Sequence, residues 1–242
     1  MITYYSDFLS GNRLKRCYDL APPRVCQYLN EEVNFVRQRI KPADLVLELG
    51  CGYGRVLREL SSKPALLVGI DNSLKSLQYG RNIFLKSDKM VLICMGADKL
   101  GFSDNTFDLV FCIQNGISAL GIEPKLLVQE ALRITKQNGK LILSSYSNKF
   151  WEDRLKWFQI QSEHGLVGEI DYNLTRKGMI ICKDGFKANN EEVIGDTFKS
   201  ETLMRALIDY EYIGKKNRYL CGDSTFPEEI DIIHIHSIQK LD

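Results

Sequence analysis

The stretch Leu45-Val46-Leu47-Glu48-Leu49-Gly50-Cys51-Gly52-Tyr53-Gly54 decides the fold of this chain. It begins as a short apolar run and ends in a glycine-rich loop, and residues 55–62 behind it have the pattern of a helix. Glycine allows a sharp turn and lets a ligand approach the backbone closely. The stretch therefore predicts a strand, a tight ligand-binding turn and a helix in succession.

Four further apolar runs follow at a regular rhythm, at residues 65–70, 90–95, 109–113 and 140–145. None of them alternates apolar with polar residues, so each is expected to be a strand buried on both faces. Between these runs, apolar residues recur at helical spacing at about 73–86 and 124–136, which predicts two helices. Pro124 suits the first turn of the second helix, and Asn138-Gly139 suits its end. This alternation predicts an α/β, doubly wound, mostly parallel sheet with helices on both faces.

The segments outside this rhythm complete the expected domain. They are a helix at about 24–40, an aromatic-rich helix at about 148–164, hairpins within 166–197, a helix at about 200–210, and strands at about 216–221 and 231–239. Gly222-Asp223-Ser224 is a tight connection between the last two strands, which makes them an antiparallel terminal pair in a seven-stranded sheet. One domain over 1–242 is predicted, with an N-terminal helical segment (1–43), a core (44–147), a helix and β-hairpin insert (148–197), and a last helix with two strands (198–242).

Composition excludes several classes of protein. Of 242 residues, 44% are hydrophobic and 26% are charged, which is typical of a globular chain. The 32 basic and 31 acidic residues nearly cancel, which argues against a protein that coats nucleic acid. No apolar run approaches the ~20 residues of a membrane helix, and the N-terminus lacks the pattern of a signal peptide. We therefore expect a cytoplasmic protein without membrane association.

The seven cysteines include no C-x-x-C pair, so neither a disulfide framework nor a zinc site is expected. Cys51, Cys94 and Cys112 lie inside apolar runs and are expected to be buried thiols. His234 and His236 would share one strand face, but no third metal ligand accompanies them. The sequence predicts no metal centre.

Acidic residues stand at the ends of three successive predicted strands, at Glu48, Asp71 and Asp98. In doubly wound folds an acid after the second strand accepts hydrogen bonds from a ribose diol. The loop reads G-x-G-x-G and not the G-x-G-x-x-G of dinucleotide sites, which disfavours NAD. A purely structural turn is the other alternative, and the three acids in register argue against it.

These motifs together resemble the class I S-adenosylmethionine-dependent methyltransferases. The likeness covers about 44–147 and consists of E-L-G-C-G-Y-G (48–54), G-I-D (69–71), G-A-D (96–98), N-T-F-D-L-V (105–110) and R-I-T-K-Q-N-G-K-L (133–141). Five motifs in order, at suitable spacing, are far more specific than any one of them. The resemblance implies S-adenosylmethionine as cofactor and S-adenosylhomocysteine as product.

The resemblance also implies a cofactor-binding set: Glu48, Gly50, Cys51, Gly52, Gly54, Asp71, Asn72, Ala97, Asp98, Gln114, Tyr18 and Arg24. In this assignment Asp71 binds the ribose hydroxyls and Asp98 the adenine edge. Gln114 lies near the methionine part and the acceptor. Tyr18 and Arg24 close over the cofactor, with Arg24 toward its carboxylate.

A sulfonium already activates its methyl group, so positioning and a dry pocket suffice and neither metal nor covalent nucleophile is required. A base is needed only where the acceptor must lose a proton, and none is identified.

A small-molecule acceptor is expected, because no basic domain is appended and the 148–197 insert can cap a pocket. The aromatic residues of that insert, Phe150, Trp151, Trp157 and Phe158, wall this pocket or form core. Methylation of RNA or protein, and a cofactor-binding module without turnover, stay open, as do the acceptor atom and the oligomeric state.

Overall fold

The computed structural model describes residues 4–84, 88–146, 148–189, 210–220 and 230–240, the last two ranges as strand backbone. Its centre is a sheet of five parallel strands in the order β3-β2-β1-β4-β5. The strands are β1 (Leu45–Leu49), β2 (Leu66–Asp71), β3 (Met90–Cys94), β4 (Phe107–Cys112) and β5 (Thr135–Tyr146). The predicted α/β fold with a parallel core is confirmed.

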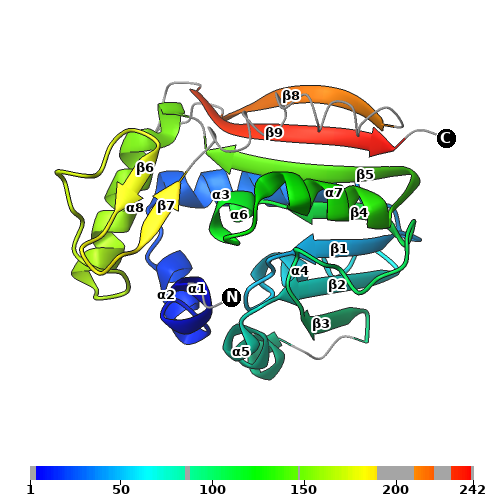
Figure 1. The fold of residues 1–242 in the computed structure, drawn as a ribbon, viewed down its shortest axis with the longest axis horizontal. Helices are drawn as coiled ribbons and strands as arrows, with labels where there is room; N and C mark the ends of the chain where they lie inside the picture. Colours follow the sequence, from blue (N-terminus) through cyan, green and yellow to red (C-terminus); the bar gives the residue numbers. More distant parts are fainter. Residues whose placement is uncertain (1–3, 85–87, 147, 190–209, 221–229, 241–242) are drawn as a thin grey trace.

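Helices cover both faces of this sheet (Figure 1). One face packs against α3 (Pro23–Arg37), α4 (Arg55–Leu60) and α5 (Leu74–Phe84), and the other against α6 (Gly116–Ala119) and α7 (Pro124–Ile134). Neighbouring residues of one strand enter opposite clusters: Val46 joins the first and Leu47 the second, and both are fully buried. Because both faces need apolar residues, the strands read as continuous apolar runs.

The third strand departs from this expectation because β3 is the sheet's edge. Its burial pattern is mixed, and Val91 is 40% exposed. The prediction that Cys94 is a buried thiol is wrong, since this cysteine is exposed, whereas Cys51 and Cys112 are buried as expected. The helix before β5 also ends at Ile134, ahead of the predicted stop at Asn138-Gly139.

One layer of the structure lies over the ends of the strands. It is formed by helices that precede α3 and by the segment that follows β5. It contains α1 (Tyr4–Asp7), α2 (Asn12–Asp19), the short 3₁₀ helix η1 (Asn148–Phe150), α8 (Trp151–Glu163) and the hairpin of β6 (Met179–Ile181) and β7 (Lys187–Asn189). Leu9 and Cys17 share a buried cluster with Phe158, Leu166 and residues of the hairpin. We call residues 4–20 and 150–188 together the cap.

Four hydrogen bonds among the described residues tie the two halves of the cap. The Arg13 guanidinium donates to the carbonyls of Gly165 at 2.7 Å and Leu166 at 3.0 Å. The Tyr4 hydroxyl donates to Asp184 at 2.5 Å, and the Trp157 indole to the Cys17 carbonyl at 2.8 Å. The N-terminal helical segment predicted over 1–43 contains α1 and α2, although the sequence pattern gave bounds only for the helix at about 24–40. The contacts of α1 and α2 with α8 and the hairpin supply the stability that such short helices lack alone.

Two further strands lie beyond β5 (Figure 1). The backbone of β9 (Ile230–Lys240) pairs antiparallel with β5, and β8 (Tyr210–Leu220) pairs antiparallel with β9. The predicted helix at 200–210 falls on residues 200–209 outside the described part, as does the turn at Gly222-Asp223-Ser224. No helix of the described residues is long and apolar enough to cross a membrane.

Candidate functional site

Two adjoining cavities lie where the strands end, at the point where the strand order reverses between β1 and β4. The central cavity lies between the loop after β1 and the cap, and the side cavity lies between that loop and the loop after β3. Both are lined by Gly50, Asp71, Asn72 and Leu120. In open α/β sheets this position is the usual place for ligands.

The glycine loop between β1 and α4 depends on left-handed backbone. The φ angles of Gly50, Gly52 and Gly54 are +74°, +55° and +81°, a region that other residues rarely adopt. Asp71 holds the loop: one carboxylate oxygen accepts from the Gly52 amide at 2.8 Å and the other from the Ser73 amide at 2.7 Å. Burial raises the pKa of Asp71 while these two hydrogen bonds lower it. Asp71 is thus both a cavity wall and a support of the loop.

Glu48 is the next-to-last residue of β1, and it lines the central cavity. The residue is only 5% exposed, and its Oε2 has no hydrogen-bond partner in the described part of the chain. Burial raises the pKa of Glu48 to about 8, although the nearby Arg55 opposes the shift. A buried carboxylate oxygen without a partner is costly, so its presence here favours a ligand that brings a donor or a positive charge.

Arg55 is a site residue that the sequence reasoning missed. It begins α4, lines the central cavity and pairs with Glu59 at 3.1 Å. Its guanidinium carbon lies 4.6 Å from the centre of the Tyr18 ring, and its Nε and Nη2 atoms are buried without partners in the described part. The available signal was its place directly after the last glycine, where a helix starts.

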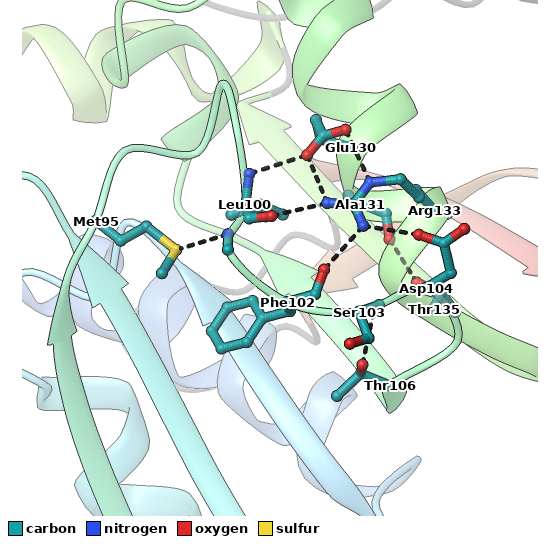
Figure 2. A network of polar contacts seen from close by, with 11 residues as sticks. Met95, Leu100, Phe102, Ser103, Asp104, Thr106, Glu130, Ala131, Arg133 and Thr135 are labelled. Carbon is teal, nitrogen blue, oxygen red and sulfur yellow. Dashed lines mark hydrogen bonds and ion pairs between the residues drawn. The ribbon is translucent and has the colours of Figure 1, made fainter.

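The side cavity includes Ala97 and Asp98 from the loop after β3. Figure 2 shows how Arg133 of α7 holds the following residues of that loop. Its guanidinium donates to the carbonyls of Leu100 and Phe102 and to the Asp104 carboxylate, each at 2.8 Å.

Glu130 completes this network. It accepts from Arg133 at 2.9 and 2.8 Å and from the Leu100 amide at 2.9 Å, while the Gly101 amide points to the Met95 sulfur at 3.4 Å (Figure 2). The hydrogen bonds from Arg133 to Glu130 raise the pKa of Arg133, so its guanidinium stays charged. The R-I-T segment that sequence reasoning used only as a family motif therefore anchors one wall of the side cavity.

Gln114 follows β4 in an unusual conformation, with φ +59°, and Asn115 after it has φ +60°. The Gln114 amide nitrogen of the backbone donates to Glu32 at 3.2 Å and to Ser144 at 3.0 Å. The Tyr18 hydroxyl donates to the Gln114 side-chain oxygen at 3.2 Å, and Nε2 has no partner among the described residues. Strained backbone held this firmly is typical of a functional position.

Ten of the twelve predicted cofactor residues line these cavities: Tyr18, Glu48, Gly50, Cys51, Gly52, Asp71, Asn72, Ala97, Asp98 and Gln114. Gly54 lines neither cavity and is the N-cap residue before α4. Arg24 lines neither and is buried in the first turn of α3, with Nη1 3.1 Å from the Gln27 oxygen. Among the described residues, Arg55 is the arginine that lines the central cavity.

The aromatic residues divide between wall and core. Trp157 and Phe158 line the central cavity, together with Tyr5 and Tyr146, which sequence reasoning did not select. Phe150 is fully buried instead, with its ring centre 4.9 Å from that of Tyr28. Within the described ranges no group of three His, Cys, Asp or Glu side chains could hold a metal ion.

Comparison with known proteins bears on this arrangement. Residues 46–139 match the family described as "Methyltransferase domain". This segment is therefore similar to known methyltransferase domains. The match spans the glycine loop, Asp71, Asp98 and Gln114, and it confirms the resemblance drawn from the motifs.

Among curated relatives, this chain is similar to the demethylmenaquinone methyltransferase of Corynebacterium urealyticum. The two are 34% identical over 111 residues, which cover 46% of this chain and 45% of the relative. The sterol 24-C-methyltransferase of Saccharomyces cerevisiae is 26% identical over 169 residues, 65% of this chain and 43% of the relative. The chain spans less than half the length of these relatives.

Solved structures share the fold. A protein from Pyrococcus horikoshii OT3 superimposes with a TM-score of 0.59 at 18% identity, covering 98% of both chains. The 4+2 cyclase SpnF reaches a TM-score of 0.56 at 15% identity, covering 87% of this chain and 80% of SpnF. At such identities the likeness concerns fold alone, and function has to be argued from the site.

Proposed function

We propose that this protein is an S-adenosylmethionine-dependent methyltransferase that acts on a small-molecule acceptor. The observation that carries the proposal is the Glu48 carboxylate, buried in the central cavity with one oxygen unpartnered among the described residues. Asp71 adds hydrogen-bond acceptors to the same wall, and the glycines beside it, in the left-handed conformation, leave space for a ligand. These acceptor groups fit a ligand with an amino group, a sulfonium and a ribose diol.

The two cavities divide the cofactor between them in this proposal. Asp98 and Ala97 hold the adenine in the side cavity, and Asn72 flanks it. Asp71 stands at the boundary of both cavities, where the ribose hydroxyls lie. Glu48 accepts from the amino group of the methionine part, and Arg55, in place of Arg24, donates to its carboxylate. Bound there, S-adenosylmethionine supplies an activated methyl group.

The chain's own residues then orient the reactants and exclude water. Gln114 stands at the carboxyl end of β4 with its amide fixed through Tyr18, between the glycine loop and the aromatic wall. Tyr5, Trp157 and Phe158 close the cavity from the cap. A dry, shaped cavity favours direct displacement because the attacking atom and the methyl group are held in line.

The small-molecule acceptor is supported by the enclosed position of the aromatic wall beneath the cap and by the named substrates of the relatives. Those relatives are named as methyltransferases of demethylmenaquinone and of sterols. The near-zero net charge of the chain favours neither nucleic acid nor a membrane surface as partner.

The wider architecture belongs to the same proposal. We infer a single domain over residues 1–242 with a seven-stranded sheet, to which β9 and β8 contribute an antiparallel terminal pair. We also place the protein in the cytoplasm, because the six cysteines of the described residues are all free, as a reducing compartment requires.

Calorimetric titration tests the proposal directly. We expect S-adenosylmethionine and S-adenosylhomocysteine to bind with micromolar dissociation constants and NADH to give no heat. Arg55→Met should weaken both ligands at least roughly tenfold, since a charge-assisted hydrogen bond is lost, whereas Arg24→Met should not. Absence of binding by both sulfur ligands, in folded protein, would refute the proposal.

A further inference from the structure

A third, smaller cavity opens beside the central cavity, and we call it the arm. It shares Tyr5, Gln114, Ala119, Tyr146 and Phe158 with the central cavity. Its remaining wall comes from the loop after β4, from α6, from α8 and from the β6–β7 hairpin. A molecule that enters the arm therefore contacts Gln114, and no residue of the glycine loop lines the arm.

The charges of the arm differ from those of the other two cavities. Arg154 and Lys187 line it, and no Asp or Glu of the described residues does. By contrast, the central and side cavities carry the carboxylates of Glu48, Asp71 and Asp98. The acidic cavities suit a cationic, hydroxyl-bearing cofactor, whereas the arm offers positive charge.

Arg154 is a built feature of the arm rather than a surface residue. It is 1% exposed, its Nη2 donates to the Ala188 carbonyl at 3.0 Å, and its guanidinium carbon lies 4.6 Å from the centre of the Tyr146 ring. These contacts fix the guanidinium plane against the aromatic wall. Guanidinium groups held in this way recognise carboxylate and phosphate groups with two parallel hydrogen bonds.

Two more donors face the same region. The Gln114 Nε2 and the Ser118 hydroxyl are both buried, and neither has a hydrogen-bond partner in the described part of the chain. Because Gln114 already accepts from Tyr18 through its oxygen, the amide group that it can offer is the donor. Buried donors without partners are rare, and a bound acceptor group would satisfy both.

The geometry points to the arm as the acceptor site, and to an acceptor that carries an oxyanion, a carboxylate or a phosphate, at the end that meets Arg154 and Lys187. This inference rests on the proposed function, since the group to be methylated would lie at Gln114, next to the cofactor. The body of the molecule would pack between the rings of Tyr146 and Phe158. The bound oxyanion would take up the donors that line the arm.

Four matched probes test this on protein loaded with S-adenosylhomocysteine: benzoate, phenyl phosphate, benzamide and benzylamine. We expect at least one oxyanion to bind about tenfold more tightly than the neutral benzamide, since a charge-assisted hydrogen bond replaces a neutral one. Benzylamine should not bind. Tighter binding of benzoate would identify a carboxylate, and tighter binding of phenyl phosphate a phosphate.

Variants of the hairpin and of α6 locate the binding. Lys187→Met should weaken binding of the oxyanion roughly two- to fivefold, as for an exposed ion pair, because Lys187 is exposed, and should leave binding of benzamide unchanged. Lys183→Met is the matched control, because Lys183 is in the same hairpin but pairs with Glu169 at 2.7 Å. Ser118→Ala should also weaken the oxyanion without disturbing the fold.

The outcomes separate this inference from the proposed function. The inference is overturned, and the proposed function stands, if S-adenosylhomocysteine binds but benzamide binds as tightly as both oxyanions. The same holds if Lys187→Met and Lys183→Met change the affinity for the oxyanion equally. If S-adenosylhomocysteine does not bind, the proposed function fails, whatever the oxyanions do.

Discussion

Replacing Glu48 by Gln should raise the free energy of unfolding and at the same time weaken cofactor binding. The substitution keeps the shape of the side chain and deletes its charge. Burial raises the pKa of Glu48 from an ordinary 4.5 to about 8. A raised carboxyl pKa means that the folded state binds a proton that the unfolded state has released, so stability falls as pH rises from 4.5 through 8.

The magnitude follows from that shift. At pH 7 the unfolded carboxyl is ionised and the folded one is mostly protonated, which corresponds to an upper limit of about 3 kcal/mol of lost stability. At pH 5 the same relation gives less than about 1 kcal/mol. Water in the cavity screens part of the charge, so Glu48→Gln should raise the free energy of unfolding by about 1–3 kcal/mol at pH 7.

Urea unfolding of both proteins without cofactor, at pH 5 and pH 7, measures this difference. Glu163→Gln is the control, since Glu163 is exposed at the end of α8 and should change stability by less than about 0.5 kcal/mol. Calorimetry should show a loss of at least roughly tenfold in affinity for S-adenosylhomocysteine in Glu48→Gln. A variant no more stable than the parent at pH 7, or a gain that is equal at both pH values, would refute the reasoning.

Three other substitutions follow from the described contacts. Asp71→Asn leaves either the Gly52 or the Ser73 amide facing an NH₂ group, so it should cost about 1–3 kcal/mol in urea unfolding and weaken cofactor binding more than tenfold; unchanged affinity would contradict the assignment. Arg133→Met removes the anchors of the 100–104 loop and should cost about 1–2 kcal/mol, with faster amide exchange at Leu100 than at residues of β1. Trp157→Phe loses the bond to the Cys17 carbonyl and should lower the thermal midpoint, at a cost of about 1–2 kcal/mol; an equal midpoint would show that this bond adds nothing to the cap.

The core could be predicted from the sequence because its physical requirement is simple. Strands such as β1 and β4 face helices on both sides, so their residues are continuously apolar. Parallel strands end at one edge, which brings Glu48, Asp71 and Asp98 to adjoining cavities although they are far apart in the chain. Sequence motifs at the ends of parallel strands therefore predict which residues lie close together in the fold.

The remainder depends on contacts that no local pattern encodes. Cys94 reads as a core residue, and only the strand order makes β3 an edge. The choice between Arg24 and Arg55 depends on how α3 packs, which buries the former and leaves the latter to the cavity wall. The wall residue Tyr5 comes from α1, a helix of four residues that packs against the other half of the cap.

The joined halves of the cap have a consequence for biosynthesis. Leu9 and Cys17 are synthesised about 140 residues or more before the side chains that bury them, which lie between Phe158 and Ala188. At the usual ~5–20 residues per second, these early apolar groups wait several seconds for their partners. The nascent chain can form its parallel core in that interval, but it cannot close the cavity. A chaperone that meets this protein during synthesis should therefore bind residues 4–20, and release them once the hairpin of β6 and β7 emerges.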